Sequence, residues 1–248
     1  MHSAPMTLIW DLPTRLSHWL FALGFLAAAF IALALGEHSA LFPYHALIGL
    51  TLAAMLLLRV IWGFVGSRHA RFRDFVFPPA AVLGYFRHAL ARRDARSVGH
   101  NPASSYAIFA MLAIVAALAI TGVMLGLGLE QAKEAHELLA YAMLAVVALH
   151  VLGVALHTLR HRENITASMI HGRKHADPAL AIPSAHPLAA GLFLLLTSLW
   201  AGGLLRNFDA AAGTTTLPGT SISLQLSEAE GDRGGRTQNE RGNDRDDD

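Results

Sequence analysis

Two histidines, His136 and His150, lie fourteen residues apart within one hydrophobic stretch of the chain. Fourteen residues of α-helix advance about 21 Å and return to within about 40° of the same face. One helix would therefore present two imidazoles at two depths of a membrane whose hydrocarbon core is about 30 Å thick. Imidazole is a common metal ligand, and ionisable residues inside membrane spans are usually functional. The spacing indicates two metal-binding positions on one transmembrane helix.

Two further histidines, His18 and His45, lie near the starts of the first two apolar segments. Because consecutive spans alternate in direction, the depths predict an outer pair, His45 with His136, and an inner pair, His18 with His150. Two haem groups, each held by two histidines, would fit this arrangement. His157 competes with His150 because it lies seven residues further along the same face. It would separate the two positions by about 31 Å, so His150 is favoured.

Residues near these histidines fit the same interpretation. Gly49 follows His45 by one turn and Gly153 follows His150 by three residues, which leaves room for a flat macrocycle. Glycine also serves ordinary helix packing in membranes. Arg59 lies fourteen residues after His45, inside a span, where a haem propionate would pair its charge. Snorkelling of this arginine to the lipid headgroups is the alternative.

The composition indicates an integral membrane protein. The chain has 248 residues, 54% of them hydrophobic and 15% charged, and a mean hydropathy of +0.42. The expected fold is that of an all-α integral membrane protein with five transmembrane helices, the fifth of which is separated from the others by a polar stretch. The first segment is expected to be an ordinary span and not a cleaved signal peptide. The predicted spans are residues 16–35, 44–65, 103–127, 134–156 and 187–205.

The absence of cysteine narrows the chemistry. It excludes disulfides, cysteine-ligated iron–sulfur clusters and thioether-attached haem in this chain, so haem would be held non-covalently. The sequence has no Walker loop, no G-x-G-x-x-G and no H-E-x-x-H, so no nucleotide or zinc-peptidase chemistry is indicated. The arginines of residues 66–102 are explained by topology and anionic lipid, and nucleic-acid binding is not expected.

Charge predicts the orientation and the limits of the domains. Twelve lysines and arginines fall in the N-terminal segment, in residues 66–102 and after the fourth span, whereas the opposite loops carry only Lys133. The positive-inside rule then places the N-terminus in the cytoplasm of a bacterial inner membrane. Residues 1–175 are expected to form the di-haem domain and 176–208 a linker with the extra helix. Residues 209–248 are expected to be a disordered acidic tail in the periplasm.

Over about residues 8–175 the chain resembles the prokaryotic cytochrome b561 family, which includes the b-type cytochrome subunits of membrane nickel–iron hydrogenases. The resemblance is specific because several motifs occur together. One departure is Ser104, which stands where the family often has glycine after its Asn-Pro dipeptide. The motifs are residues 10–19 (WDLPTRLSHW), 45–49 (HALIG), 59–63 (RVIWG), 99–102 (GHNP) and 136–137 (HE) followed by His150.

The resemblance implies a four-helix transmembrane bundle that holds two b-haems with bis-histidine ligation, followed here by the fifth helix. The matching ligand positions are His18, His45, His136 and His150. It implies electron transfer between a membrane quinone or quinol and a redox partner. Arg15 and residues 99–102 would lie at the cytoplasmic edge, near a quinone or propionate site. The partner stays open between a periplasmic cytochrome and a dehydrogenase or hydrogenase subunit for which this chain is the haem-bearing anchor. Catalysis by the chain itself, as a superoxide:quinone oxidoreductase, is the remaining alternative.

Overall fold

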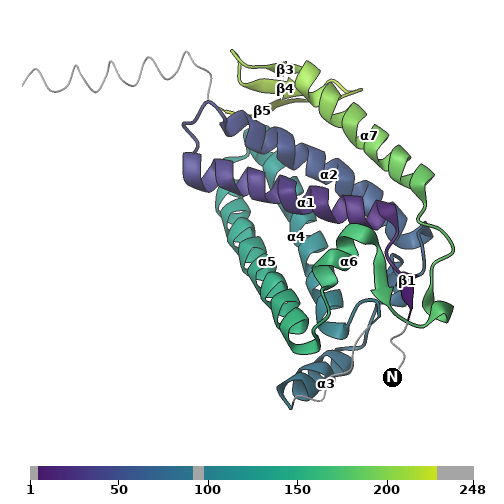
Figure 1. Ribbon diagram of the computed structural model, residues 1–248. Helices are drawn as coiled ribbons and strands as arrows, with labels where there is room; N and C mark the ends of the chain where they lie inside the picture. The colour runs from purple at the N-terminus through teal and green to yellow at the C-terminus, as the bar shows by residue number, and fades with distance from the viewer. Residues whose placement is uncertain (1–4, 92–97, 228–248) are drawn as a thin grey trace, which may run out of the picture.

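The chain is described by a computed structural model over residues 5–91 and 98–227. Within these residues it is almost entirely helical, with short strands near both ends (Figure 1). The helices are α1 (Leu12–Phe30), α2 (Phe42–Val65), α3 (Pro79–Leu90), α4 (Pro102–Gly126), α5 (Lys133–His161), α6 (Ile165–His171) and α7 (Pro187–Arg206). The strands are β1 (Met6–Leu8), β2 (Arg173–His175), β3 (Phe208–Asp209), β4 (Thr214–Thr216) and β5 (Ser223–Gln225).

Five of the described helical segments are long and apolar enough to cross a membrane, which confirms the predicted multi-pass membrane architecture. The first continues from α1 through one π-helical turn, Ile31–Leu35. Large apolar side chains such as Leu23, Leu57 and Leu138 are exposed on their surfaces, as lipid-facing residues are in a bilayer. The segments are Leu12–Leu35, Phe42–Val65, Pro102–Gly126, Glu130–His161 and Pro187–Arg206.

Local chemistry explains where these helices begin. The Asp11 side chain accepts a hydrogen bond from the backbone N–H of Thr14, which caps α1. Asn101 caps α4 through a reciprocal capping box with Ser104. Ser104, the departure from the family pattern, therefore has a clear structural use. Proline occupies the first turn of α1, α2, α4 and α7, where its missing N–H costs nothing.

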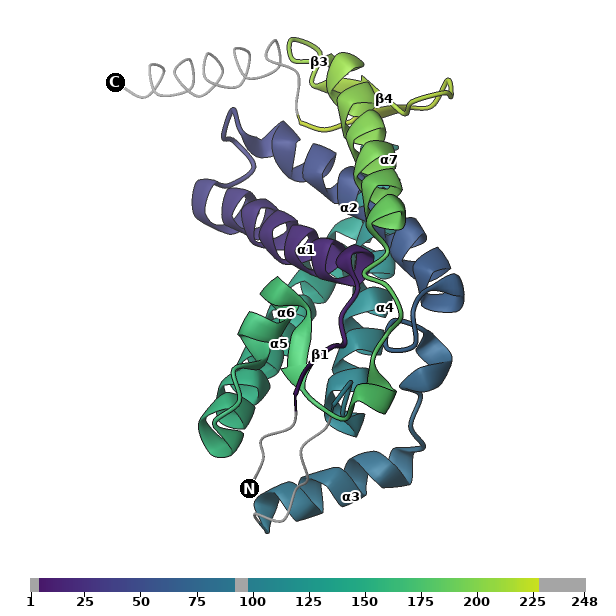
Figure 2. The same cartoon turned by 45° about the vertical axis from the view of Figure 1, so that its right-hand side comes forward.

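The long helices form two hairpins joined through one contact. α1 packs against α2, and α4 packs against α5 (Figures 1 and 2). The contact between α2 and α4 holds the two hairpins together. α7 packs on the outside against α1 and α2. In the described chain, α5 packs closely against α4 and not against α1 or α2. In the described residues, the backbone of α5 therefore lies further from the first hairpin than it does from α4.

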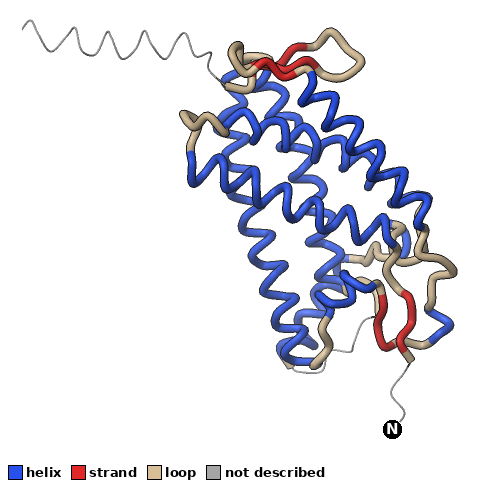
Figure 3. Tube along the Cα trace, turned by 45° about the horizontal axis from the view of Figure 1, so that its top comes forward, coloured by secondary structure: helices blue, strands red, loops and turns tan. Residues whose placement is uncertain are grey.

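One end of the bundle, which we call the basic end, carries the N-terminus, α3, α6 and residues 162–186. Here β1 pairs antiparallel with β2, with Met6 opposite His175 and Leu8 opposite Arg173. Figure 3 shows this pair as the strands nearest the N-terminus. The pairing joins the start of the chain to the segment that follows the fourth span, about 170 residues later.

The opposite end is covered by a three-stranded antiparallel sheet in the order β3-β4-β5. Leu224 and Leu226 pack with Leu204 of α7 and Leu47 of α2 in one buried cluster. This sheet corrects the expectation that the chain is disordered from residue 209, because residues 208–227 bury enough apolar surface to fold. The remainder of the predicted tail, residues 228–248, lies outside the described residues.

Candidate functional site

His45 of α2 and His136 of α5 form a pair across the bundle. Their ring centres are 6.1 Å apart and their planes are inclined by 76°. Two imidazoles that share one metal ion through nitrogens about 2 Å away have ring centres roughly 6 Å apart. The backbones of the two helices are not in close contact, so the two helices approach each other here through these side chains. The structure thus brings together the two histidines that the sequence predicted as the outer pair.

The tautomer of His45 follows from its hydrogen bond. Its Nδ1 lies 2.9 Å from the carbonyl oxygen of Ala28, on α1. A carbonyl only accepts, so Nδ1 carries the proton and donates it. The lone pair is then on Nε2, which is the arrangement that orients a metal-binding histidine.

His136 is oriented in the same way by Thr121 of α4. Its Nδ1 lies 2.8 Å from Thr121 Oγ1, and that hydroxyl donates to the carbonyl of Ala117 at 2.9 Å. Since the single hydroxyl proton is used in the helix, Nδ1 of His136 is the donor to Oγ1. Gly122 of α4 faces the same ring, and a Cβ there would be in ordinary van der Waals contact with Cε1, at 3.5 Å. Sequence reasoning missed both residues, although Thr121 is a polar residue within an apolar run.

The glycines singled out in the sequence face open space. A Cβ at Gly49 or at Gly153 would meet no atom within 4 Å. Together with the loose packing of α5 on the first hairpin, these positions leave room beside the histidines for a flat ring. The residues present therefore fit haem.

His18 of α1 and His150 of α5 lie within electrostatic range of each other, toward the basic end. Nδ1 of His18 is buried and has no hydrogen-bond partner. A buried polar atom without a partner is costly, so it marks a place where another group completes the structure. The structure brings this second predicted pair into one region, again from two helices that do not pack closely.

Arg59 of α2 belongs to the same region and is 7% exposed. Its Nη2 donates to the carbonyl of Ala70 at 3.3 Å and its guanidinium lies 5.3 Å from the centre of the Phe72 ring. Its Nη1 is buried without a partner. A buried guanidinium with an unused donor fits the carboxylate of a haem propionate.

Asp11 is the nearby acid that sequence reasoning did not single out, although it lies within the first family motif. It is 1% exposed, and besides capping α1 it accepts from the indole N–H of Trp62 at 3.2 Å and from the hydroxyl of Ser67. It also acts electrostatically on Arg59. Asp11 therefore ties the start of α1 to the end of α2 beside the inner histidine pair.

Two other candidates are engaged elsewhere. Nε2 of His157 lies 3.7 Å from Glu163 and is buried without a hydrogen-bond partner, and its ring centre is 4.5 Å from that of His161, with the planes inclined by 44°. Arg15 donates to the carbonyl of Ile170 at the end of α6, and its Nε is buried without a partner. The choice of His150 over His157 as the inner ligand stays a prediction. The contact of Arg15 with Ile170 gives this arginine a role in holding α6.

The motif at residues 99–102 contains the cap of α4, Asn101, and a histidine packed among aromatic rings, His100. His100 packs between the rings of Trp10 and Phe75, with ring-centre distances of 4.9 and 4.4 Å. Burial among these rings, with the Arg59 charge near it, lowers the pKa of His100 to about 3. Burial likewise lowers the pKa of His69. His100 is therefore a neutral imidazole at ordinary pH.

The pKa of His100 predicts acid sensitivity. Between its ordinary value near 6.5 and about 3, the unfolded chain binds a proton that the folded chain does not, so the free energy of unfolding decreases as pH falls. At about pH 5 the loss amounts to roughly 2 kcal/mol. Denaturant unfolding at about pH 7 and about pH 5 measures it, and His100→Gln is expected to remove this part of the pH dependence. An unchanged dependence in the variant would contradict this assignment.

The fold is that of a multi-pass helical membrane protein, and within it His45 of α2 and His136 of α5 lie side by side. The chain belongs to the prokaryotic cytochrome b561 family, whose model matches residues 9–172. It is therefore a membrane protein of haem-b electron transfer. α7 and the β3–β5 sheet lie beyond the matched residues.

Curated proteins named "Probable Ni/Fe-hydrogenase B-type cytochrome subunit" are similar to this chain. The protein from Rhizobium leguminosarum bv. viciae is 29% identical over 211 residues, which cover 67% of this chain and 87% of that protein. The protein from Bradyrhizobium diazoefficiens is 26% identical over 214 residues, covering 68% of this chain and 86% of that protein. The protein from Rhodobacter capsulatus is 23% identical over 215 residues, covering 67% of this chain and 80% of that protein. No solved structure matches the chain.

Proposed function

We propose that this protein carries electrons between a membrane quinone and a redox partner through two b-haems, each held by two histidines. His45 and His136 would hold the outer haem, and His18 and His150 the inner one. When bound, each haem would supply one-electron chemistry between Fe(III) and Fe(II), and the two histidines of each pair would hold it. The observation that carries the proposal is the His45–His136 pair, in which both Nδ1 atoms donate hydrogen bonds and both Nε2 atoms are left to bind metal.

The residues of the inner region have distinct tasks in this proposal. Arg59 would pair a propionate through its unused Nη1, and Gly49 and Gly153 would leave space beside the ligands. His100, neutral and close to Arg59, lies where a quinone headgroup could accept or donate a hydrogen bond at the basic end. Arg15 would hold α6 against this region.

The setting of the proposal is the bacterial inner membrane, with the basic end in the cytoplasm. The distribution of lysine and arginine supports this orientation. The outer histidine pair would then be near the periplasmic surface, where a partner delivers or receives electrons. The similarity to hydrogenase cytochrome subunits supports a hydrogenase as that partner. A periplasmic cytochrome, another dehydrogenase and direct oxidation of superoxide are the alternative donors.

The first test is the haem content of protein purified in mild detergent. A pyridine haemochrome assay, normalised to protein by amino-acid analysis, is expected to give two b-haems per chain, with a reduced-minus-oxidised spectrum typical of low-spin iron. One haem per chain would overturn one of the two ligand pairs, and none would overturn the function. Bound hydrogenase subunits in the same preparation would support the anchor role, whereas quinone reduction with superoxide by the isolated chain would support the enzymatic one.

A further inference from the structure

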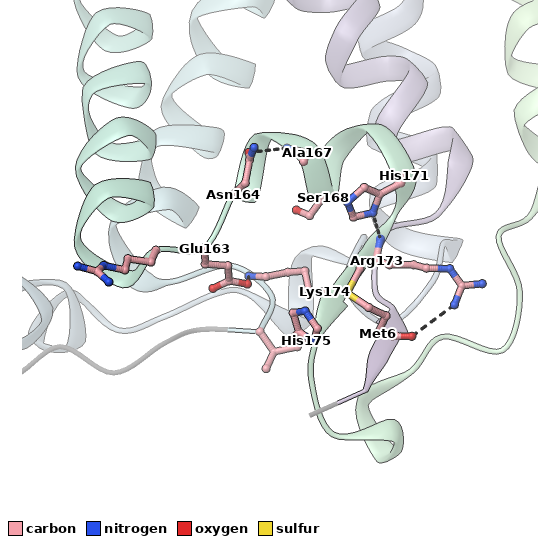
Figure 4. A pocket seen from close by; sticks show the side chains of 11 residues that line it. Met6, Glu163, Asn164, Ala167, Ser168, His171, Arg173, Lys174 and His175 are labelled. Atoms are coloured by element: carbon pink, nitrogen blue, oxygen red, sulfur yellow. Dashed lines mark hydrogen bonds and ion pairs between the residues drawn. The ribbon is translucent and has the colours of Figure 1, made fainter. Parts of the chain in front are cut away.

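A pocket at the basic end lies apart from both histidine pairs. It has a volume of about 330 Å³ and is formed by α6, β2 and the turn that follows α5 (Figure 4). This volume is at the lower limit for pockets that bind small molecules. No step of the proposed electron transfer uses it.

The charges of its lining are unbalanced. Arg162, Arg173 and Lys174 contribute three positive charges, and Glu163 is the one acid among the lining residues. Glu163 is already paired, since its Oε1 lies 3.2 Å from Nζ of Lys174, and Figure 4 shows these two side chains meeting tip to tip. Arg162 and Arg173 are thus left without a carboxylate on the lining, and Nη1 of Arg173 donates to the carbonyl oxygen of Met6 at 3.4 Å. The pocket favours an anion.

The backbone conformation of Arg162 also supports an anion site. This residue ends α5 in the left-handed conformation, with φ of 51°. Glycine is the usual residue at this position of a helix end, because a side chain there is strained. Gly172 occupies the corresponding position at the end of α6, with φ of 83°. At the end of α5, by contrast, an arginine that lines the pocket occupies this position.

The surroundings place the pocket at the level of lipid headgroups. α5 is a membrane-spanning helix that ends at His161, next to the pocket. α6 is held by the indole N–H groups of Trp10 and Trp19, which donate to Ser168 and Met169, and tryptophan prefers the membrane interface. Leu159 and Ile170, on the helices that border the pocket, are 77% and 61% exposed. Apolar surface of this kind suits acyl chains below a headgroup.

We propose that this pocket binds the phosphate of an anionic phospholipid of the adjacent leaflet, with Arg162 and Arg173 as its charged contacts. Basic pockets beside transmembrane helices on the cytoplasmic side commonly bind such headgroups. The shared chemistry is a phosphate ester, and the exposed leucine and isoleucine favour a lipid over a soluble phosphate. The inference does not depend on the number of haems or on the redox partner.

The test uses the full haem-loaded chain, stripped of native lipid in detergent. Native mass spectrometry and thermal melting are followed as phosphatidylglycerol or phosphatidylcholine is added. Phosphatidylglycerol is expected to bind and to raise the melting temperature. The double variant Arg162→Gln/Arg173→Gln is expected to bind it roughly 30-fold more weakly, at about a factor of five per arginine. Arg87→Gln, which changes an exposed arginine of α3 at the same end, is the matched control and should bind as the wild type does.

Two further measurements keep the outcome decisive. Arg162→Gly removes the guanidinium but suits the left-handed backbone, so it should melt no lower than wild type without lipid and still lose affinity. Glycerol phosphate and inorganic phosphate, added as soluble probes, should give no comparable stabilisation. Equal stabilisation by the soluble probes would overturn a lipid as the source. Equal weakening in Arg87→Gln would overturn the pocket, since it would show diffuse attraction to a basic surface.

Discussion

Replacing His45 or His136 with alanine is expected to remove one and the same haem, which leaves about half of the pigment of the wild-type protein. Each imidazole supplies one axial ligand, and a haem that is held non-covalently by a single histidine binds far more weakly. The two variants should have identical residual spectra, because both retain only the inner haem. Haem content per chain and potentiometric titration of the remaining haem measure this result.

Alanine variants of the inner pair are expected to lose the other haem, and His157→Ala serves as their control. His18→Ala and His150→Ala should each leave the outer haem, with a midpoint potential different from that left in the first two variants. His157→Ala should retain both haems, because the contacts of this side chain are with Glu163 and His161. Loss of a haem in His157→Ala with retention in His150→Ala would reverse the inner assignment. Different residual spectra for His45→Ala and His136→Ala would contradict the outer pair.

The sequence predicted the spans well because the physical signal is strong and local. A run of about 20 apolar residues has few alternatives to a membrane helix, and the observed limits differ from the predicted ones by a few residues. Helix geometry likewise converts the spacing of histidines into depth, which predicted that His45 and His136 would lie at the same level. His45 and His136 lie side by side in the structure as their depths require.

The features that the sequence did not predict depend on contacts between distant segments. β1 and β2 are three residues long, too short for an alternating pattern, and each is defined by the other. The β3–β5 segment was predicted to be disordered because it is rich in threonine, glycine and serine. Leu224 and Leu226 nevertheless alternate with polar residues, as in a strand with one buried face. Thr121 orients His136 only because α4 and α5 pack together. In the sequence, the only indication of a role for Thr121 was that it is a polar residue within an apolar span.

Asp11 is the residue whose loss we expect to destabilise the fold most. It is buried, and it accepts hydrogen bonds from the N–H of Thr14, the indole of Trp62 and the hydroxyl of Ser67. Asp11→Ala leaves these donors unpaired and removes the anion that acts on the buried Arg59. Loss of one partner from a buried charged group costs about 3–5 kcal/mol. Asp11→Asn keeps an oxygen for the helix cap and should cost less, roughly 2 kcal/mol.

Denaturant unfolding in detergent, followed by circular dichroism, should therefore rank wild type above Asp11→Asn and Asp11→Ala lowest. Asp209→Ala is the matched control, because Asp209 also accepts from backbone N–H groups, those of Ala211 and Ala212, but is exposed at the opposite end. It should cost no more than about 1 kcal/mol. If the charge on Arg59 is the main cause, Asp11→Asn combined with Arg59→Met should be less destabilised than the sum of the two single variants. Strict additivity would show instead that Asp11 acts through its neutral hydrogen bonds and that the inner region does not depend on this charge pair.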